Sequence, residues 1–326
     1  MIQEEKKESI KITYSLLKII TGSNLSRRRL PYMVADSLKP GPIIWLTACG
    51  HGDEVGGIVI IQEIFKKVKK KGLLKGCIHA FPLMNPIGFE TTSRNITLSK
   101  EDLNRSFPGN KKGSLGERIA NKIFSTILQT SPALVLDLHN DWIKSIPYSI
   151  IDPNPGTQYK EVNEKTKIYN KAAGLVTILD TGDIQSSLTY NLLKNKIPAL
   201  TLELGESYIV NEENITFGVN AIWNLLSHLK MIDTEDELFL YPLPDDRYRN
   251  KTLQYVDDPL SSSSGIIRFL VRPGDLIIKG QPVARIYDAF GKLQETISSL
   301  HDCIILGHSD SSVAFPGMTI VGSGIV

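Results

Sequence analysis

Residues 43–70 read IIWLTACGHGDEVGGIVIIQEIFKKVKK, and this stretch decides the class of fold. The continuous apolar run over 43–48 predicts a buried strand, since such runs are typical of parallel strands covered on both faces. The apolar spacing over 55–70 predicts a helix that ends at Gly72. Polar and glycine residues therefore gather at the point where a strand passes into a helix.

Strands and helices continue to alternate along the chain. Apolar runs predict strands at the start of 77–86 and over 133–139, 176–180 and 198–205. Helical spacing predicts helices over 4–21, 114–128 and 211–232, the second of which begins with a capping box formed by Ser114 and Glu117. This order favours an α/β domain with a largely parallel or mixed central sheet flanked by helices.

The composition of the sequence changes near residue 246. Residues 245–265, DDRYRNKTLQYVDDPLSSSSG, are polar and predict a linker, and short apolar pieces between glycines and prolines follow. We therefore predict two domains, an α/β catalytic domain over 1–245 and a small all-β domain over 246–326. The second resembles the biotinyl/lipoyl-type barrel-sandwich domain. It has no lysine at the hairpin position where such domains are modified, so a structural or gating role is expected.

Bulk composition excludes several classes of partner. The 326 residues carry a formal net charge of +2, which gives no reason to expect nucleic acid or an anionic membrane as partner. The three cysteines imply no disulfide framework and favour a reducing compartment. The N-terminal segment mixes both charges, unlike a secretory signal, and no apolar stretch has the length of a membrane span. A cytoplasmic protein is expected.

Three residues in these segments have the types that bind zinc. His51 and Glu54 are three positions apart, and His139 ends the predicted strand over 133–139. Two imidazoles and one carboxylate, with a fourth position open, form the donor set of a catalytic zinc site. Gly50 and Gly52 are expected to let the chain turn sharply between the ligands. Taken alone, a His-x-x-Glu pair is more often a surface pair, and a single histidine is more often hydrogen-bonded in a core.

Other segments contribute groups suited to amide chemistry. Arg94 and the pair Asn104–Arg105 lie in SRNITLSKEDLNRSFPG, where a guanidinium is able to clamp a carboxylate or stabilise an oxyanion. The alternative is a solvated loop with ordinary surface arginines. Glu203 ends the apolar strand PALTLELG, where a carboxylate is costly unless it is paired or functional. Glu206 competes for the same role but lies further out.

Taken in order, the motifs GHGDE, R…DLNRSFPG, DLH and PALTLELG resemble the succinylglutamate desuccinylase/aspartoacylase family. This family is the deacylase branch of the zinc carboxypeptidase superfamily, and the resemblance extends from near residue 40 to the C-terminus. It implies a zinc-carboxypeptidase-like mixed sheet and one Zn²⁺ per chain. The implied roles are zinc ligands for His51, Glu54 and His139, carbonyl polarisation for Arg94, substrate-carboxylate binding for Asn104 and Arg105, general base for Glu203, and orientation of the first histidine for Asp102.

The resemblance predicts a zinc-dependent amidohydrolase that removes an acyl group from an N-acyl amino acid or related small amide. A carboxypeptidase acting on short peptides and a catalytically silent small-molecule binding protein are the alternatives. The chain departs from the family at ITLS, before the DLNR motif, and substrate preference is expected to depend on Asn140, Asp141 and the loops 141–149 and 181–190. Cys49 is interpreted as a buried small side chain rather than a competing ligand. Homo-oligomerisation is compatible with the sequence.

Overall fold

The computed structural model of this chain describes residues 10–22, 25–180, 182, 184–234, 237–249 and 251–326. In its N-terminal three quarters the strands are β1 (Lys11–Thr21), β2 (Arg27–Asp36), β3 (Ile43–Ala48), β4 (Cys77–Phe81), β5 (Leu134–Asp141), β6 (Lys144–Ser145), β7 (Pro147–Ile151), β8 (Val176–Leu179) and β9 (Ala199–Glu206). The C-terminal strands are β10 (Thr252–Val256), β11 (Gly265–Phe269), β12 (Leu276–Ile277), β13 (Pro282–Tyr287), β14 (Leu293–Ser298), β15 (Cys303–His308), β16 (Val313–Ala314) and β17 (Val321–Ile325).

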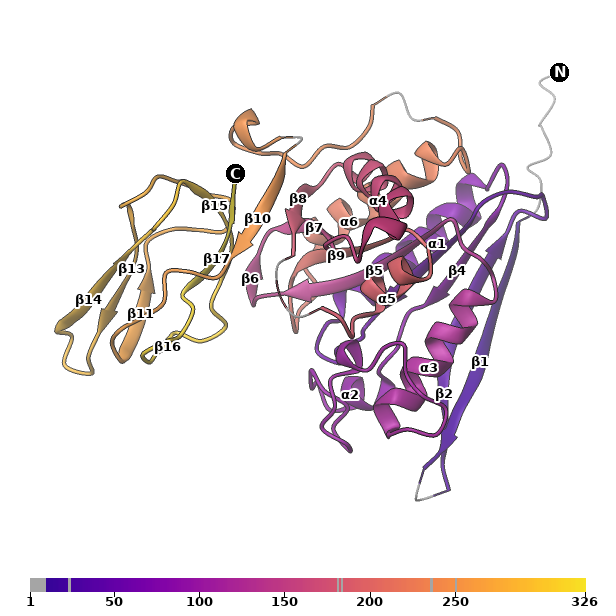
Figure 1. Cartoon of the computed structure of the whole chain (residues 1–326), viewed down its shortest axis with the longest axis horizontal. Helices are drawn as coiled ribbons and strands as arrows, with labels where there is room; N and C mark the ends of the chain where they lie inside the picture. The colour runs from indigo at the N-terminus through magenta and orange to yellow at the C-terminus, as the bar shows by residue number, and fades with distance from the viewer. Residues whose placement is uncertain (1–9, 23–24, 181, 183, 235–236, 250) are drawn as a thin grey trace.

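A mixed sheet runs through the whole molecule (Figure 1). Its strand order is β1-β2-β4-β3-β5-β9-β7-β8-β10-β17-β15-β12, with β6 paired to β15. Strands β4, β3, β5 and β9 are parallel neighbours, whereas β7 is antiparallel to β9. The predicted α/β class with a mixed central sheet is confirmed.

Helices cover both faces of the sheet around its parallel centre. The helices are α1 (Gly56–Lys71), α2 (Pro86–Glu90), α3 (Leu115–Leu128), α4 (Lys160–Ala173), α5 (Leu188–Lys194) and α6 (Glu212–His228), with 3-10 turns η1 (Leu103–Arg105), η2 (Thr157–Tyr159) and η3 (Asp246–Tyr248). The predicted capping box of α3 is present, with both of its hydrogen bonds. None of the described helices is long and apolar enough to cross a bilayer.

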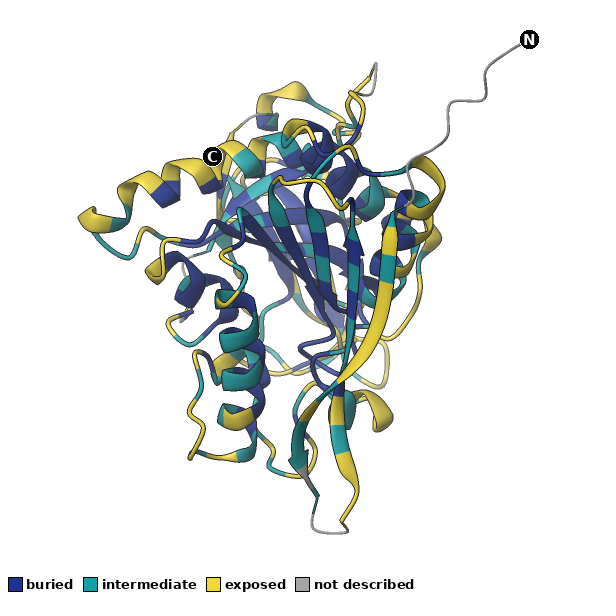
Figure 2. Cartoon of the chain, turned by 90° about the vertical axis from the view of Figure 1, so that its right-hand side faces the viewer, coloured by how far each residue is buried: buried dark blue, intermediate teal, exposed yellow. Residues whose placement is uncertain are grey.

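Strand alternation divides the core around the parallel centre of the sheet into two clusters, one on each face. Ile44 and Leu136 lie in the cluster that contains the apolar faces of α1 and α6. Trp45 and Val135 lie in the other cluster, with α3 and α5. Because side chains alternate along a strand, Asp137 and His139 project to the same face as Val135. Figure 2 shows the buried sheet between helices whose outer surfaces are exposed.

The predicted N-terminal helix over 4–21 is wrong for the described part of that segment, because Lys11–Thr21 form β1 and pair antiparallel with β2. Residues 4–9 lie outside the described residues. Ile10 and Ile12 pack on the α1 side of the sheet, whereas Leu17 and Ile19 pack on the α3 side. These apolar residues thus have even numbers at the start of the strand and odd numbers further along. This shift in the two-residue period produced a spacing that resembles that of a helix.

The C-terminal strands form a β-sandwich, as predicted. A second sheet has the order β14-β13-β11-β16, and all of its pairings are antiparallel. Its inner side chains pack against residues of β12, β15 and β17, which belong to the end of the main sheet. This part of the chain also contacts the segment after β5, since Ile143 donates its N–H to Asp310 Oδ1 at 2.7 Å.

The interpretation of 245–265 as a linker is wrong in part. Residues Thr252–Val256 form β10, which pairs parallel with β8 and antiparallel with β17. Leu253 is fully buried, and hydrogen bonds on both edges of the strand satisfy its backbone. The main sheet therefore contains strands from both sides of the expected boundary at residue 246. The division into domains 1–245 and 246–326 remains a prediction.

Candidate metal centre

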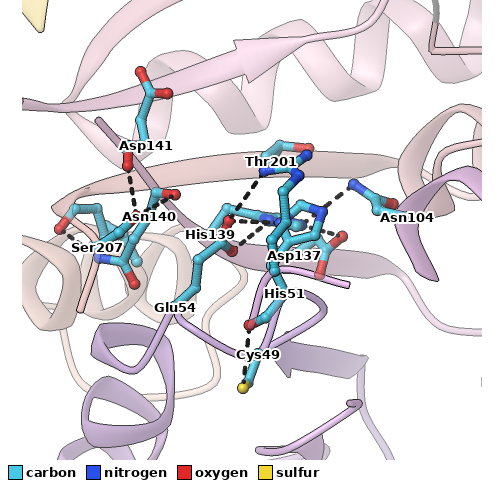
Figure 3. A network of polar contacts seen from close by, with 12 residues as sticks. Cys49, His51, Glu54, Asn104, Asp137, His139, Asn140, Asp141, Thr201 and Ser207 are labelled. Atoms are coloured by element: carbon cyan, nitrogen blue, oxygen red, sulfur yellow. Dashed lines mark hydrogen bonds and ion pairs between the residues drawn. The ribbon is translucent and has the colours of Figure 1, made fainter. Parts of the chain in front are cut away.

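The structure brings His51, Glu54 and His139 together in one buried cluster (Figure 3). One ligand atom from each residue lies within 4.8 Å of the others. The Glu54 carboxylate lies between the two rings, with Oε1 2.5 Å from His51 Nδ1 and Oε2 2.7 Å from His139 Nδ1. Among the described residues, this is the group of histidine, cysteine, aspartate and glutamate side chains that is able to hold a metal ion.

The cluster forms where β3 and β5 end. Because β3 and β5 are parallel, the turn after Ala48 and the end of β5 lie at the same edge of the sheet. His139 is paired in register with Glu203 of β9, which places the Glu203 carboxylate beside the cluster. The site is therefore built at the carboxyl ends of three adjacent parallel strands.

The expected role of the glycines needs correction. Neither Gly50 nor Gly52 has a positive φ, and the left-handed conformation in this turn belongs to Cys49, with φ of 53°. Gly52 is instead required by space, since a Cβ there would lie 2.0 Å from the backbone carbon of Gly88. The Gly52 N–H also donates to Ser93 O at 3.0 Å. The turn after β3 is thus packed directly on the backbone of α2.

We expect Gly52→Ala to lower the free energy of unfolding by about 1–3 kcal/mol, because the added methyl group has no room without backbone movement. Thermal and denaturant unfolding would measure the effect. Gly50→Ala is the matched control, since its Cβ would meet the flexible end of Met84 at 3.3 Å. Equal stability of the two variants would contradict the close-packing argument.

A carboxylate holds the outer nitrogen of each imidazole. His51 Nε2 lies 3.2 Å from Asp102 Oδ1, and His139 Nε2 lies 3.0 Å from Asp137 Oδ2. Ligating histidines usually have such a partner, which fixes the tautomer and directs the other nitrogen to the metal. Asp102 therefore lies where the resemblance implied.

Asp137 is a residue of the site that the sequence reasoning missed. It is 1% exposed, and its second oxygen accepts a hydrogen bond from Thr47 Oγ1 at 2.7 Å. The signal was present in the motif DLH, since residues two apart on a strand share a face and a buried carboxylate needs a partner.

The charges of the cluster favour a bound cation. Burial acts to lower the pKa of His139, but the carboxylates of Glu54 and Asp137 outweigh it and hold this pKa well above its ordinary value. Burial would likewise raise the pKa of Glu54, but the two imidazoles keep it below its ordinary value. An ionised carboxylate between two inward nitrogens is a donor set that fits Zn²⁺. His51, Glu54 and His139 would hold the ion.

Replacing Asp137 with Asn is expected to weaken zinc binding by about 10- to 100-fold, because the amide supports the His139 ring less well than a carboxylate. Competition with a chromophoric chelator would measure the affinity. Thr47→Val is the matched control, since it removes only the hydroxyl that contacts the other oxygen of Asp137, and we expect a smaller effect. Unchanged affinity in Asp137→Asn would rule out this supporting role.

The predicted arginines and Asn104 lie around the cluster. The Arg94 guanidinium is half exposed, with Nη2 3.2 Å from Asp102 Oδ2 and Nη1 4.0 Å from Glu54 Oε1. Asn104 accepts the N–H of Leu188 at 3.0 Å, and its Nδ2 lies 3.4 Å from His139 Nε2. Arg105 is exposed and donates to the Asn104 carbonyl at 3.1 Å. Both guanidiniums line the same cavity as the cluster.

Glu203 also lines this cavity. Its Oε2 is buried without a hydrogen-bond partner. Burial, together with the negative charges of Asp141 and Glu54, raises the pKa of Glu203 well above its ordinary value, against the effect of His139 and Arg94. Glu206 differs, since its Oε2 accepts a hydrogen bond from Asn211 Nδ2 at 2.8 Å and it does not line the cavity.

Two neighbours of the cluster have structural contacts. Cys49 is fully buried and its Sγ lies 3.3 Å from the carbonyl oxygen of His51, so it is placed as a small core side chain. Asn140 accepts the N–H of Gly56 at 3.1 Å and donates to Leu204 O at 3.3 Å. Asn140 thereby ties the start of α1 to β9, a contact between remote segments that sequence spacing did not indicate.

The cavity beside the cluster has a volume of about 160 Å³. Besides the residues already described, its lining includes Asp141, Ile150, Asp152, Asp180, Ile184, Ser187, Thr189 and Thr201. The sequence reasoning assigned no role to Asp152 or Asp180. The metal cluster, the arginines and these two further acids surround a space suited to a small polar substrate.

Proteins of known structure share this fold. The ectoine utilization protein EutE (DoeB) from Ruegeria pomeroyi, in a product-bound structure, superposes with a TM-score of 0.81 at 18% identity, over 98% of this chain and all of that chain. A metallo-carboxypeptidase from Burkholderia cenocepacia superposes with a TM-score of 0.53 at 14% identity, over 69% of this chain and 65% of its own. The predicted carboxypeptidase-like fold is therefore confirmed.

Sequence similarity identifies the family. The Succinylglutamate desuccinylase/Aspartoacylase catalytic domain matches residues 40–229, and the chain therefore belongs to this family of deacylases. A curated relative is the N-alpha-acetyl-L-2,4-diaminobutyric acid deacetylase of Halomonas elongata, which is 28% identical over 259 residues, 76% of this chain and 71% of the relative. The predicted resemblance is confirmed.

Proposed function

We propose that this protein is a zinc-dependent deacylase that hydrolyses the amide bond of an N-acyl amino acid. One observation carries the proposal: His51, Glu54 and His139 converge in a buried cluster, and Glu203, whose buried Oε2 has no hydrogen-bond partner, lines the same cavity. The family supports hydrolysis of an acyl amide, and the Halomonas relative is named for an acetylated amino acid. A bound zinc ion would supply Lewis acidity, which polarises a carbonyl group and makes water more acidic.

In the proposed mechanism Glu203 moves the proton. Its free Oε2 accepts the proton of the attacking water, and the same carboxyl group then returns it to the leaving nitrogen. The oxygen of the water bonds to the acyl carbon, and the bond between that carbon and nitrogen breaks. The second proton of the water also passes to the amine, so a carboxylate and an ammonium group leave. Burial holds the pKa of Glu203 above its ordinary value, which favours the protonated form that returns the proton, and a positive charge beside the carboxylate would favour the ionised form that accepts one.

The two arginines and Asn104 position the substrate in this proposal. Arg94 lies close enough to Glu54 for its guanidinium to donate to the oxyanion that develops on the acyl oxygen. Arg105 is exposed and lines the cavity, and the N–H groups of its guanidinium that do not donate to the Asn104 carbonyl would bind the carboxylate of the amino acid. Asn104 has its oxygen engaged by Leu188 and its Nδ2 3.4 Å from His139 Nε2, so the second N–H of its amide is the donor left for substrate.

The proposal is tested with purified protein loaded with zinc. N-acetyl and N-succinyl amino acids and short peptides are offered in parallel, and release of the free amine is followed. We expect turnover of N-acyl amino acids well above that of peptides. Faster cleavage of peptides would identify a carboxypeptidase, and no turnover of either class would identify a binding protein.

A further inference from the structure

Two carboxyl groups lie on the side of the cavity formed by β7 and β8. Asp152 follows the last residue of β7, and Asp180 follows the last residue of β8. These strands are parallel and in register, and the Asp180 N–H donates to the carbonyl of Ile151 at 3.1 Å. Because β7 is antiparallel to β9, both aspartates lie toward the start of β9, and both line the cavity that extends from there to the metal cluster.

The Asp152 carboxyl group is buried and incompletely paired. Asp152 is 4% exposed, and its Oδ2 is buried with no hydrogen-bond partner. The side chain of Thr189 forms a hydrogen bond with the Asp152 carboxyl group. Among the described residues, no lysine, arginine or histidine forms an ion pair with Asp152. Burial of an unpaired carboxylate is costly, so a positive group beside Oδ2 would be strongly favoured.

The charges around Asp152 also favour a positive group beside its carboxylate. Burial, with the negative charges of Asp180 and Asp137, raises the pKa of Asp152 to about 7. Arg94 and Arg105 are the positively charged residues that line the cavity, and the proposed function already assigns both of them to substrate binding. A cation that enters with the substrate would offset the repulsion between Asp152 and Asp180.

A resident metal does not explain the pair. Among the described residues, the group of ligand atoms close enough to hold a metal is His51, Glu54 and His139, and it does not include Asp152 or Asp180. A primary ammonium group suits the place better, since it has three N–H donors and needs only a few acceptors such as a carboxylate oxygen and a hydroxyl.

We propose that Asp152, with Asp180 beside it, is a subsite for a protonated amine on the side chain of the substrate. The protein would then select N-acyl derivatives of diamino acids, with the acyl amide at the metal cluster and the free ammonium group at Asp152. This inference rests on the proposed function, because both place the substrate in one cavity. Asp152 acts here as a specificity-determining residue.

The test compares two substrates of equal shape. N-acetyl-L-2,4-diaminobutyrate carries the ammonium group, and N-acetyl-L-norvaline has a methyl group in its place. For the wild type we expect a higher kcat/KM with the charged substrate. Asp152→Asn should lower kcat/KM for the charged substrate by about 30-fold or more, because it removes the charge that faces the ammonium group. The norvaline derivative should change by no more than a few-fold.

Two further variants sharpen the comparison. Asp180→Asn should cause a smaller loss with the charged substrate only. Asp36→Asn is the control, since Asp36 ends β2, pairs in register with the first residue of β4 and does not line the cavity. An unchanged ratio of the two substrates in Asp152→Asn, or a wild-type preference for the norvaline derivative, would overturn the subsite.

Calorimetric binding of free L-2,4-diaminobutyrate and L-norvaline separates this inference from the proposed function. Binding of diaminobutyrate that is lost in Asp152→Asn, without turnover of any acyl substrate, would retain the subsite and reject the deacylase. Turnover of both acyl substrates with no effect of Asp152→Asn would retain the deacylase and reject the subsite. Melting temperatures equal to that of the wild type would show that the variants fold.

Discussion

Replacing Glu203 with glutamine is expected to reduce deacylation by about 10²- to 10⁴-fold, the usual contribution of a general acid–base group. The substitution keeps the shape of the side chain and removes its ability to take a proton. Because Glu203 is not among the three residues that converge on the metal position, zinc content should stay at the wild-type level. Steady-state kinetics and elemental analysis of the same preparation would measure both quantities.

The structure offers a matched control on the same strand. Glu206 lies three residues further along β9, outside the cavity, and is hydrogen-bonded to Asn211. Glu206→Gln should therefore retain activity within a few-fold of the wild type. Full activity in Glu203→Gln, with a large loss in Glu206→Gln, would transfer the role of base to Glu206.

Removing a ligand of the cluster is expected to abolish both metal binding and activity. Glu54→Ala deletes the carboxylate that lies between the two imidazoles, and His51→Ala deletes one of the rings. The remaining two donors are too few for a tight zinc site. Zinc content, measured after dialysis against a weak chelator, should fall from one equivalent per chain to a small fraction of it.

Cys49→Ser is the control for this second prediction. The Cys49 thiol lies two residues before His51, but its Sγ contacts the His51 carbonyl and not the cluster. Zinc content and activity should therefore remain near the wild-type values. Full zinc content in either Glu54→Ala or His51→Ala would show that the ion binds elsewhere, and loss of zinc in Cys49→Ser would make the thiol a ligand.

Local patterns in the sequence predicted much of the fold. The apolar run of β3, the helical spacing of α1 and the capping box at Ser114 all appear in the structure. These features depend on residues a few positions apart, so periodicity and spacing are sufficient to indicate them. The edge strand β1 was missed because its apolar residues serve two different faces of the sheet.

The sequence by itself determined which residue types stand at the ends of the strands, among them His51, His139 and Glu203. Only the tertiary structure decided what surrounds them: Asp137 behind His139, Gly52 against α2, and Asp152 beside Asp180 across the cavity. The physical reason is that strand pairing joins segments far apart in the chain. Spacing along one segment determines which face a side chain is on, but the register between strands determines which side chains meet.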